Sequence, residues 1–135
     1  VSEDTLALME DKRASLIPTL NALSGLSLNY VGSEARKNID IMTERHLSAM
    51  SRAKDLGVCL LPGSDSGASF LPYGTSYLKE LYLFEKAGLS IKQILTASVA
   101  GELKEGLSAD FIILKGFNVE AVFVNGTPVS RNTVF

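Results

Sequence analysis

The sequence predicts an α/β fold followed by a small antiparallel β unit. Segments with helical apolar periodicity alternate with apolar runs bounded by turn residues over most of the chain, which is typical of an α/β protein. The last part instead holds apolar strands and the hairpin signal Asn125-Gly126. We therefore expect an α/β unit over residues 1–101 and a β unit over residues 102–135.

Composition limits the class of protein. Apolar residues make up 46% of the 135 residues, and the net charge is −2. No basic run or basic helix face occurs, so neither nucleic acid nor an anionic membrane is an expected partner. No apolar stretch has the length of a transmembrane helix, and the first residues do not form a signal peptide. We expect a cytoplasmic protein and, without an initiator Met, part of a longer chain.

The first half should contain two helices separated by one strand. Ser2 is a good N-cap for a helix that runs to Arg13. Residues 14–20 are predicted to form a strand that ends near Pro18 and leaves Thr19 at its mouth. The turn chemistry of residues 21–32 predicts a loop. A long amphipathic helix should then cover residues 33–55, with Gly57 as its C′ residue.

The most informative stretch is residues 58–67, Val-Cys-Leu-Leu-Pro-Gly-Ser-Asp-Ser-Gly. Its apolar run before a Pro-Gly break predicts a strand buried on both faces, as in a parallel sheet. Asp65 then follows the carboxyl end of that strand, where α/β folds collect catalytic side chains. Its neighbours are small, so a ligand or metal can approach the carboxylate. The alternative for Asp65 is structural, as a helix cap or a brace of a turn.

Cys59 and His46 are each the single residue of their kind in the chain. Cys59 lies in the apolar strand, so we expect a small buried hydrophobe and not a nucleophile. One cysteine excludes an intrachain disulfide and a cysteine-based zinc cluster. His46 lies inside the long helix without an i, i+4 ligand partner, which favours a structural or surface role.

A loop over residues 66–74 follows Asp65 and carries Phe70 and Tyr73. Loops at strand ends shape substrate pockets, so both aromatic residues are candidates for substrate binding; the alternative is that they only pack.

Two helices should follow this loop. The first covers residues 75–87, and its inward register is formed by Leu78, Leu81, Tyr82 and Glu85. The second covers residues 91–100 after the cap Ser90, with Ile94, Leu95 and Val99 inward. Beyond a break at residues 101–106, strands are predicted over residues 109–114 and 119–124.

Several short motifs follow one another in a specific order along nearly the whole chain. They are Ile17-Pro18-Thr19-Leu20, Gly63-Ser64-Asp65-Ser66-Gly67, Glu80-Leu81, Ala87-Gly88-Leu89-Ser90 with Ile94-Leu95-Thr96-Ala97, and residues 105–114 with 122–126. In this order they resemble the carboxyl-terminal part of a metal-dependent amidohydrolase, in the imidazolonepropionase-like branch. Each motif alone is weak, and their order and spacing make the resemblance specific.

The resemblance implies the last strands and helices of a (β/α)8 TIM barrel, with part of a composite β-sandwich over residues 102–135. It implies that Asp65 is a metal ligand and the catalytic proton acceptor, and that the cofactor is a divalent metal, with zinc as the expected ion. Such a metal activates water, and a carboxylate can accept the proton of that water. The implied activity is hydrolysis of a C–N bond in a cyclic amide, an amide or a peptide-like substrate.

The chain departs from the family's pattern because the histidine and lysine or glutamate ligands of earlier barrel strands are absent. One ligand cannot hold a catalytic zinc, so the segment alone should be inactive. It should need the rest of the barrel or another subunit. The loops near residues 101–105 and 116–119 are also shorter than the family's, and we expect missing loop segments there.

Two non-hydrolase alternatives stay open. A truncated or degenerate barrel module could act in assembly, because incomplete barrels expose strand edges that pair with another chain. An ordinary doubly wound α/β binding domain is the other alternative, although no glycine-rich phosphate loop occurs.

Overall fold

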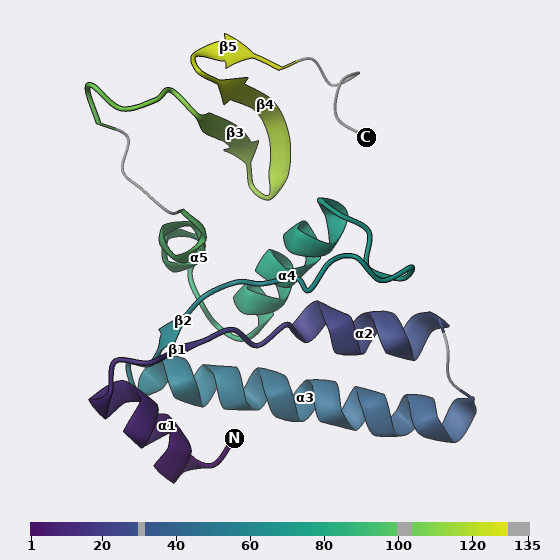
Figure 1. The fold of residues 1–135 in the computed structure, drawn as a ribbon. Coiled ribbons are helices and arrows are strands. Elements are labelled where there is room, and N and C mark those ends of the chain that lie inside the picture. The colour runs from purple at the N-terminus through teal and green to yellow at the C-terminus, as the bar shows by residue number, and fades with distance from the viewer. Residues whose placement is uncertain (30–31, 100–103, 130–135) are drawn as a thin grey trace. The chain divides into compact units, whose positions relative to one another are not determined.

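The structure is a computed structural model that describes residues 1–29, 32–99 and 104–129 (Figure 1). Its helices are α1 (Glu3–Asp11), α2 (Leu20–Asn29), α3 (Ser33–Asp55), α4 (Thr75–Lys86) and α5 (Ile91–Ser98). Its strands are β1 (Ser15–Leu16), β2 (Cys59–Leu60), β3 (Phe111–Lys115), β4 (Asn118–Val124) and β5 (Thr127–Pro128). The predicted mixed α/β class is confirmed, whereas the barrel stays a prediction.

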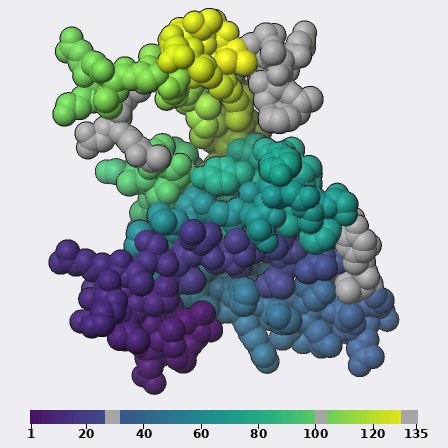
Figure 2. All heavy atoms as spheres, viewed as in Figure 1, coloured from purple at the N-terminus to yellow at the C-terminus, as the bar shows by residue number. Residues whose placement is uncertain are grey.

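The chain divides into two compact units, unit 1 over Val1–Ser98 and unit 2 over Val99–Phe135. On the face seen in Figure 2, the atoms of α1 to α4 form a continuous packed surface. No helix within the described ranges is both long and apolar enough to cross a membrane.

Unit 1 contains a parallel pair, β1 and β2, joined through α2 and α3. Ser15 pairs with Cys59 and Leu16 with Leu60, and the N–H of Leu61 donates to the carbonyl of Leu16 at 3.0 Å. Both predicted strands therefore exist, but each is only two residues long and shorter than predicted. The parallel direction brings the carboxyl ends of both strands to the same edge.

Cys59 is exposed, so the prediction that it is a buried hydrophobe was wrong. Its strand has one neighbour in the described part of the chain, and nothing there covers the face that carries Cys59. Val58 and Leu60, on either side of it, are buried. The strand is thus half-buried, and the apolar run alone did not distinguish this from burial on both faces.

Helix termini that have local capping signals lie where the sequence predicts them. Ser2 accepts a hydrogen bond from the N–H of Thr5 at 3.3 Å and caps α1. Helix α3 has the predicted bounds, and Gly57 follows it with φ of 82°. Before α5, the hydroxyl of Ser90 accepts from the N–H of Gln93 at 3.3 Å, and the amide oxygen of Gln93 accepts from the N–H of Ser90 at 2.9 Å.

Helix α2 replaces the loop that was predicted for residues 21–32. Gly25 does not form a turn within it; a Cβ there would lie 3.0 Å from Cδ2 of Phe70 and 3.3 Å from Cδ2 of Leu71. Glycine therefore allows the loop after β2 to pack closely on α2. Residues 30–31 of the predicted loop lie outside the described residues.

The buried face of α4 also differs from the predicted register. Leu81 is buried as expected, but Tyr82 and Glu85 are exposed, and the buried positions are Ser76, Glu80, Leu81 and Phe84. Ser76, Glu80 and Phe84 follow the i, i+4, i+8 spacing of one helix face, and Leu81 lies next to Glu80. In α5, Ile94 is buried and Leu95 half-buried, while Val99, predicted to point inward, lies beyond the helix end and is 62% exposed.

Glu80 joins α4 to the start of α2. Its side chain is fully buried, and its two carboxylate oxygens accept hydrogen bonds from the N–H groups of Leu20 at 2.9 Å and Asn21 at 2.7 Å. These two groups belong to the first turn of α2 and have no partner within the helix. Burial raises the pKa of Glu80 above 4.5, and the two backbone hydrogen bonds oppose this increase.

Unit 2 is a three-stranded antiparallel sheet in the order β3-β4-β5. Asn125 and Gly126 have φ of 48° and 73°, which confirms the predicted hairpin turn. Phe111 and Phe123 stack across β3 and β4 with ring centroids 4.6 Å apart. Hydrogen bonds from the hydroxyl of Ser108 and the N–H of Asn125 lower the pKa of Asp110.

Gly63 allows the segments that follow β1 and β2 to lie close together, and substitution of this glycine tests the contact. A Cβ at Gly63 would lie 2.5 Å from Cγ2 of Ile17, so Gly63→Ala should lower the free energy of unfolding by about 1–3 kcal/mol. Urea unfolding measures the loss. In the background of Ile17→Ala the same change should cost clearly less, and equal costs in both backgrounds would contradict the predicted contact.

The raised pKa of Glu80 predicts a pH-dependent stability. The folded chain holds this proton more tightly than the unfolded chain, so the stability from this group falls as pH rises from 4.5 through the folded pKa. Glu80→Gln should lack that decrease, and urea unfolding between pH 4 and pH 8 would detect it. Glu85→Gln, exposed on the same helix, should keep the wild-type pH profile. The prediction fails if wild type and Glu80→Gln differ by the same amount at every pH.

Candidate functional site

The candidate site lies where the chain leaves the carboxyl ends of β1 and β2. Beyond β1 the chain passes through Ile17 and Pro18 to Thr19, and beyond β2 it passes through Pro62 and Gly63 to Asp65. Because the strands are parallel, both connections start at the same edge. The close approach between Gly63 and Ile17 shows that the two connections stay in contact after the last paired residues.

Thr19 and Asp65 both have left-handed backbone conformations, with φ of 46° and 49°. Only two other described residues besides glycine share this property, Arg13 and Asn125, at a helix end and in a hairpin turn. A left-handed conformation costs a residue with a Cβ about 1–3 kcal/mol, and such residues cluster at ligand sites. Two of these four left-handed residues, Thr19 and Asp65, therefore lie beyond the carboxyl ends of β1 and β2.

The Asp65 carboxylate is exposed and available. The structure gives it no hydrogen bond or ion pair with any described residue, while the adjacent hydroxyls of Ser64 and Ser66 bond to each other at 2.7 Å. The next helix, α4, begins at Thr75 with Gly74 as its N-cap. Asp65 is therefore not a helix cap, which removes one of the two structural alternatives for this residue.

The loop after Asp65 is closed by its own backbone. The N–H of Gly67 donates to the carbonyl of Leu71 at 3.0 Å, and Leu71 is buried. The closed segment, residues 67–71, begins two residues after Asp65.

Phe70 and Tyr73 occupy different environments in this loop. Phe70 is half-buried against Gly25 of α2, so it packs the loop onto the helix. Tyr73 is 69% exposed, and its hydroxyl lies 3.1 Å from where a Cβ of Gly67 would stand. The phenol therefore lies over the loop that follows Asp65. Substrate binding by Phe70 and Tyr73 stays a prediction.

The described residues do not form a metal centre by themselves. Within them, no group of three or more His, Cys, Asp and Glu side chains is arranged to hold a metal ion. Asp65 is one oxygen ligand, whereas a catalytic zinc normally takes three protein ligands. A zinc site at this edge would need its other ligands from outside the described residues.

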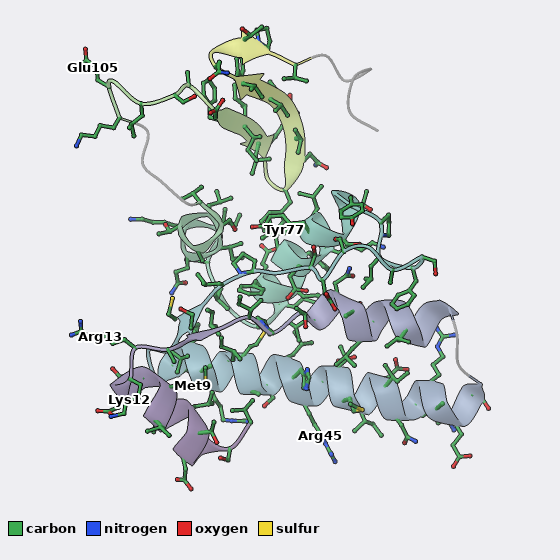
Figure 3. All side chains as sticks on the ribbon, viewed as in Figure 1. Met9, Lys12, Arg13, Arg45, Tyr77 and Glu105 are labelled. Carbon is green, nitrogen blue, oxygen red and sulfur yellow. The ribbon has the colours of Figure 1, made fainter. Side chains whose placement is uncertain are left out.

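His46 lies away from the strand ends, on the exposed side of α3. It borders a shallow depression of about 380 Å³ that is also lined by Met42, Arg45, Ala49 and Arg52. Arg45 extends outward from α3 in Figure 3. None of the described residues that line this depression carries a carboxylate. The exposure of His46 agrees with the predicted structural or surface role.

Sequence reasoning missed the role of Glu80 at this site. Its carboxylate binds the two backbone N–H groups directly after Thr19. The available signal was a glutamate one turn after Ser76, one turn before Phe84 and beside Leu81. Its partner lies about 60 residues earlier in the chain, so no local pattern could identify it.

Comparison with known proteins gives a likeness in fold. No protein-family model matches the chain, and no curated protein matches it. A crystal structure of a Xaa-Pro dipeptidase with methionine bound in its active site is similar over 96% of this chain, with a TM-score of 0.73 and 19% sequence identity. This chain covers 37% of the dipeptidase chain. The likeness concerns the fold alone: this chain has the fold of part of the longer dipeptidase chain.

Proposed function

We propose that this chain is part of a hydrolase that cleaves a C–N bond in an amide or peptide-like substrate, with Asp65 as its proton-accepting carboxylate. One observation carries the proposal. Asp65 is exposed, has no partner among the described residues and has a left-handed backbone, beyond the carboxyl ends of a parallel strand pair, in a chain whose fold matches part of a dipeptidase. That edge is the usual place of catalytic groups in α/β folds.

The chemistry fits one free carboxylate. When water attacks an amide carbonyl, a C–O bond forms and the water loses a proton; when the C–N bond breaks, the leaving nitrogen gains one. A carboxylate within hydrogen-bond reach can accept the first proton and return it to the nitrogen. The small neighbours Ser64, Ser66 and Gly67 leave room for a substrate beside Asp65.

A shared cation belongs to the same proposal. The resemblance implies a divalent metal, zinc by expectation, and Asp65 would supply one ligand. The other ligands would come from the rest of a (β/α)8 barrel or from another subunit, because the described residues do not complete the set. Unit 2 would then belong to the composite β-sandwich.

A second candidate function is assembly without catalysis. The β1–β2 pair is short. Cys59 in β2 is exposed, and Ile17, directly after β1, is 55% exposed. Unpaired strand edges with apolar side chains readily pair with another chain. Completion of a barrel by a partner would use the same edges, so only activity separates the two functions.

Asp65→Asn tests the proposal in the longest natural protein that contains this sequence. Asparagine keeps the size of the side chain but cannot accept the proton, so kcat should fall by about 10²–10⁴ with dipeptides and simple amides as substrates. Elemental analysis of the same samples measures bound metal.

Asp55→Asn, at an exposed position beside Lys54 at the end of α3, is the matched control and should retain activity. Unchanged hydrolysis in Asp65→Asn would remove Asp65 from the mechanism. A wild-type protein that hydrolyses none of these substrates and binds no metal would favour the assembly function.

A further inference from the structure

Thr19 is not the residue that caps α2, although it precedes the helix. A threonine at this place normally uses its hydroxyl to accept a hydrogen bond from an N–H of the first turn. Here Glu80 accepts from Leu20 and Asn21 instead, at 2.9 and 2.7 Å, and the carbonyl of Thr19 accepts from the N–H of Ala22 at 3.2 Å. The first three N–H groups of α2 are therefore satisfied without the Thr19 hydroxyl.

The backbone of Thr19 is held in an unfavourable conformation. Its φ of 46° is rare for a β-branched residue, because the branched side chain crowds the backbone there. Such a conformation persists only when the surroundings determine it. The residue after Thr19 supplies two such constraints: Leu20 is fully buried, and its N–H is bound by Glu80.

The hydroxyl of Thr19 makes no hydrogen bond with another described residue, and the residue is half-buried. Thr19 follows the end of β1, as Asp65 follows the end of its parallel neighbour β2. We propose that Thr19 is a further residue of the site whose hydroxyl hydrogen-bonds the amide or peptide-like substrate, and that Glu80 is the positioning residue that holds Thr19 there. This inference rests on the proposed function.

The contact is tested in the longest natural protein, with the amide or dipeptide that it hydrolyses best. Thr19→Val removes the hydroxyl and keeps the shape, so kcat/KM should fall about three- to tenfold, the usual effect of one lost hydrogen bond. Thr19→Ser restores the hydroxyl and should recover most of the activity. Equal losses in Val and Ser variants would show that the hydroxyl does not act.

The positioning role is tested by coupling and by NMR. Glu80→Gln should shift the backbone amide resonances of Leu20 and Asn21 and speed their hydrogen exchange, because glutamine has one acceptor oxygen for two donors. It should lower kcat/KM by a similar factor, and the double variant with Thr19→Val should lose little more than either single variant. Glu85→Gln, exposed on α4, is the control for both measurements.

The outcomes separate the two proposals. If Asp65→Asn abolishes hydrolysis but Thr19→Val leaves kcat/KM unchanged, the proposed function stands and the role of Thr19 is wrong. If Glu80→Gln leaves the amides of Leu20 and Asn21 unchanged, or if its kinetic loss simply multiplies with that of Thr19→Val, the positioning role is wrong. A wild-type protein without hydrolase activity would overturn the proposed function and the contact of Thr19 together.

Discussion

The interaction on which unit 1 depends is the pair of hydrogen bonds between the Glu80 carboxylate and the first turn of α2. A fully buried carboxylate is costly unless its oxygens are satisfied, and helix N-termini offer unsatisfied N–H groups and a partial positive charge. Each group thus offsets part of the desolvation cost of the other. The result fixes the direction in which the chain leaves β1, although β1 itself contributes few hydrogen bonds.

Two parallel strands of two residues cannot define a site by their own pairing. The surrounding contacts complete the definition: Gly63 lies against Ile17, Gly25 lies against Phe70, and Glu80 binds the turn after Thr19. The glycine contacts depend on the absence of a side chain, and the Glu80 contact depends on burial. Together they bring two left-handed residues, Thr19 and Asp65, to one edge.

Sequence reasoning succeeded where the determinants are local. The caps Ser2 and Ser90, the bounds of α3 and the turn at Asn125-Gly126 all follow from neighbouring residues. It also placed Asp65 beyond the carboxyl end of a strand, and in the structure Asp65 follows β2 after residues 61–64. The catalytic role of Asp65 remains a prediction.

The errors arose where distant partners decide the outcome. Helix α2 was predicted as a loop because its Ser, Asn and Gly residues favour turns, and its cap comes from α4. The exposure of Cys59 depends on how many strands flank β2, which an apolar run does not encode. The inward face of α4 was misjudged because the buried glutamate is Glu80 and not Glu85. The partners of Glu80 are two backbone N–H groups of α2, about 60 residues earlier in the chain.

The contact between Gly25 and Phe70 has a mechanical consequence. Phe70 belongs to the loop that starts at Asp65, and its ring lies directly on the middle of α2. The Phe70 ring occupies the space into which a side chain at position 25 of α2 would extend. A larger residue at position 25 would therefore move the loop away from α2, so the close seating of the segment after Asp65 depends on this glycine.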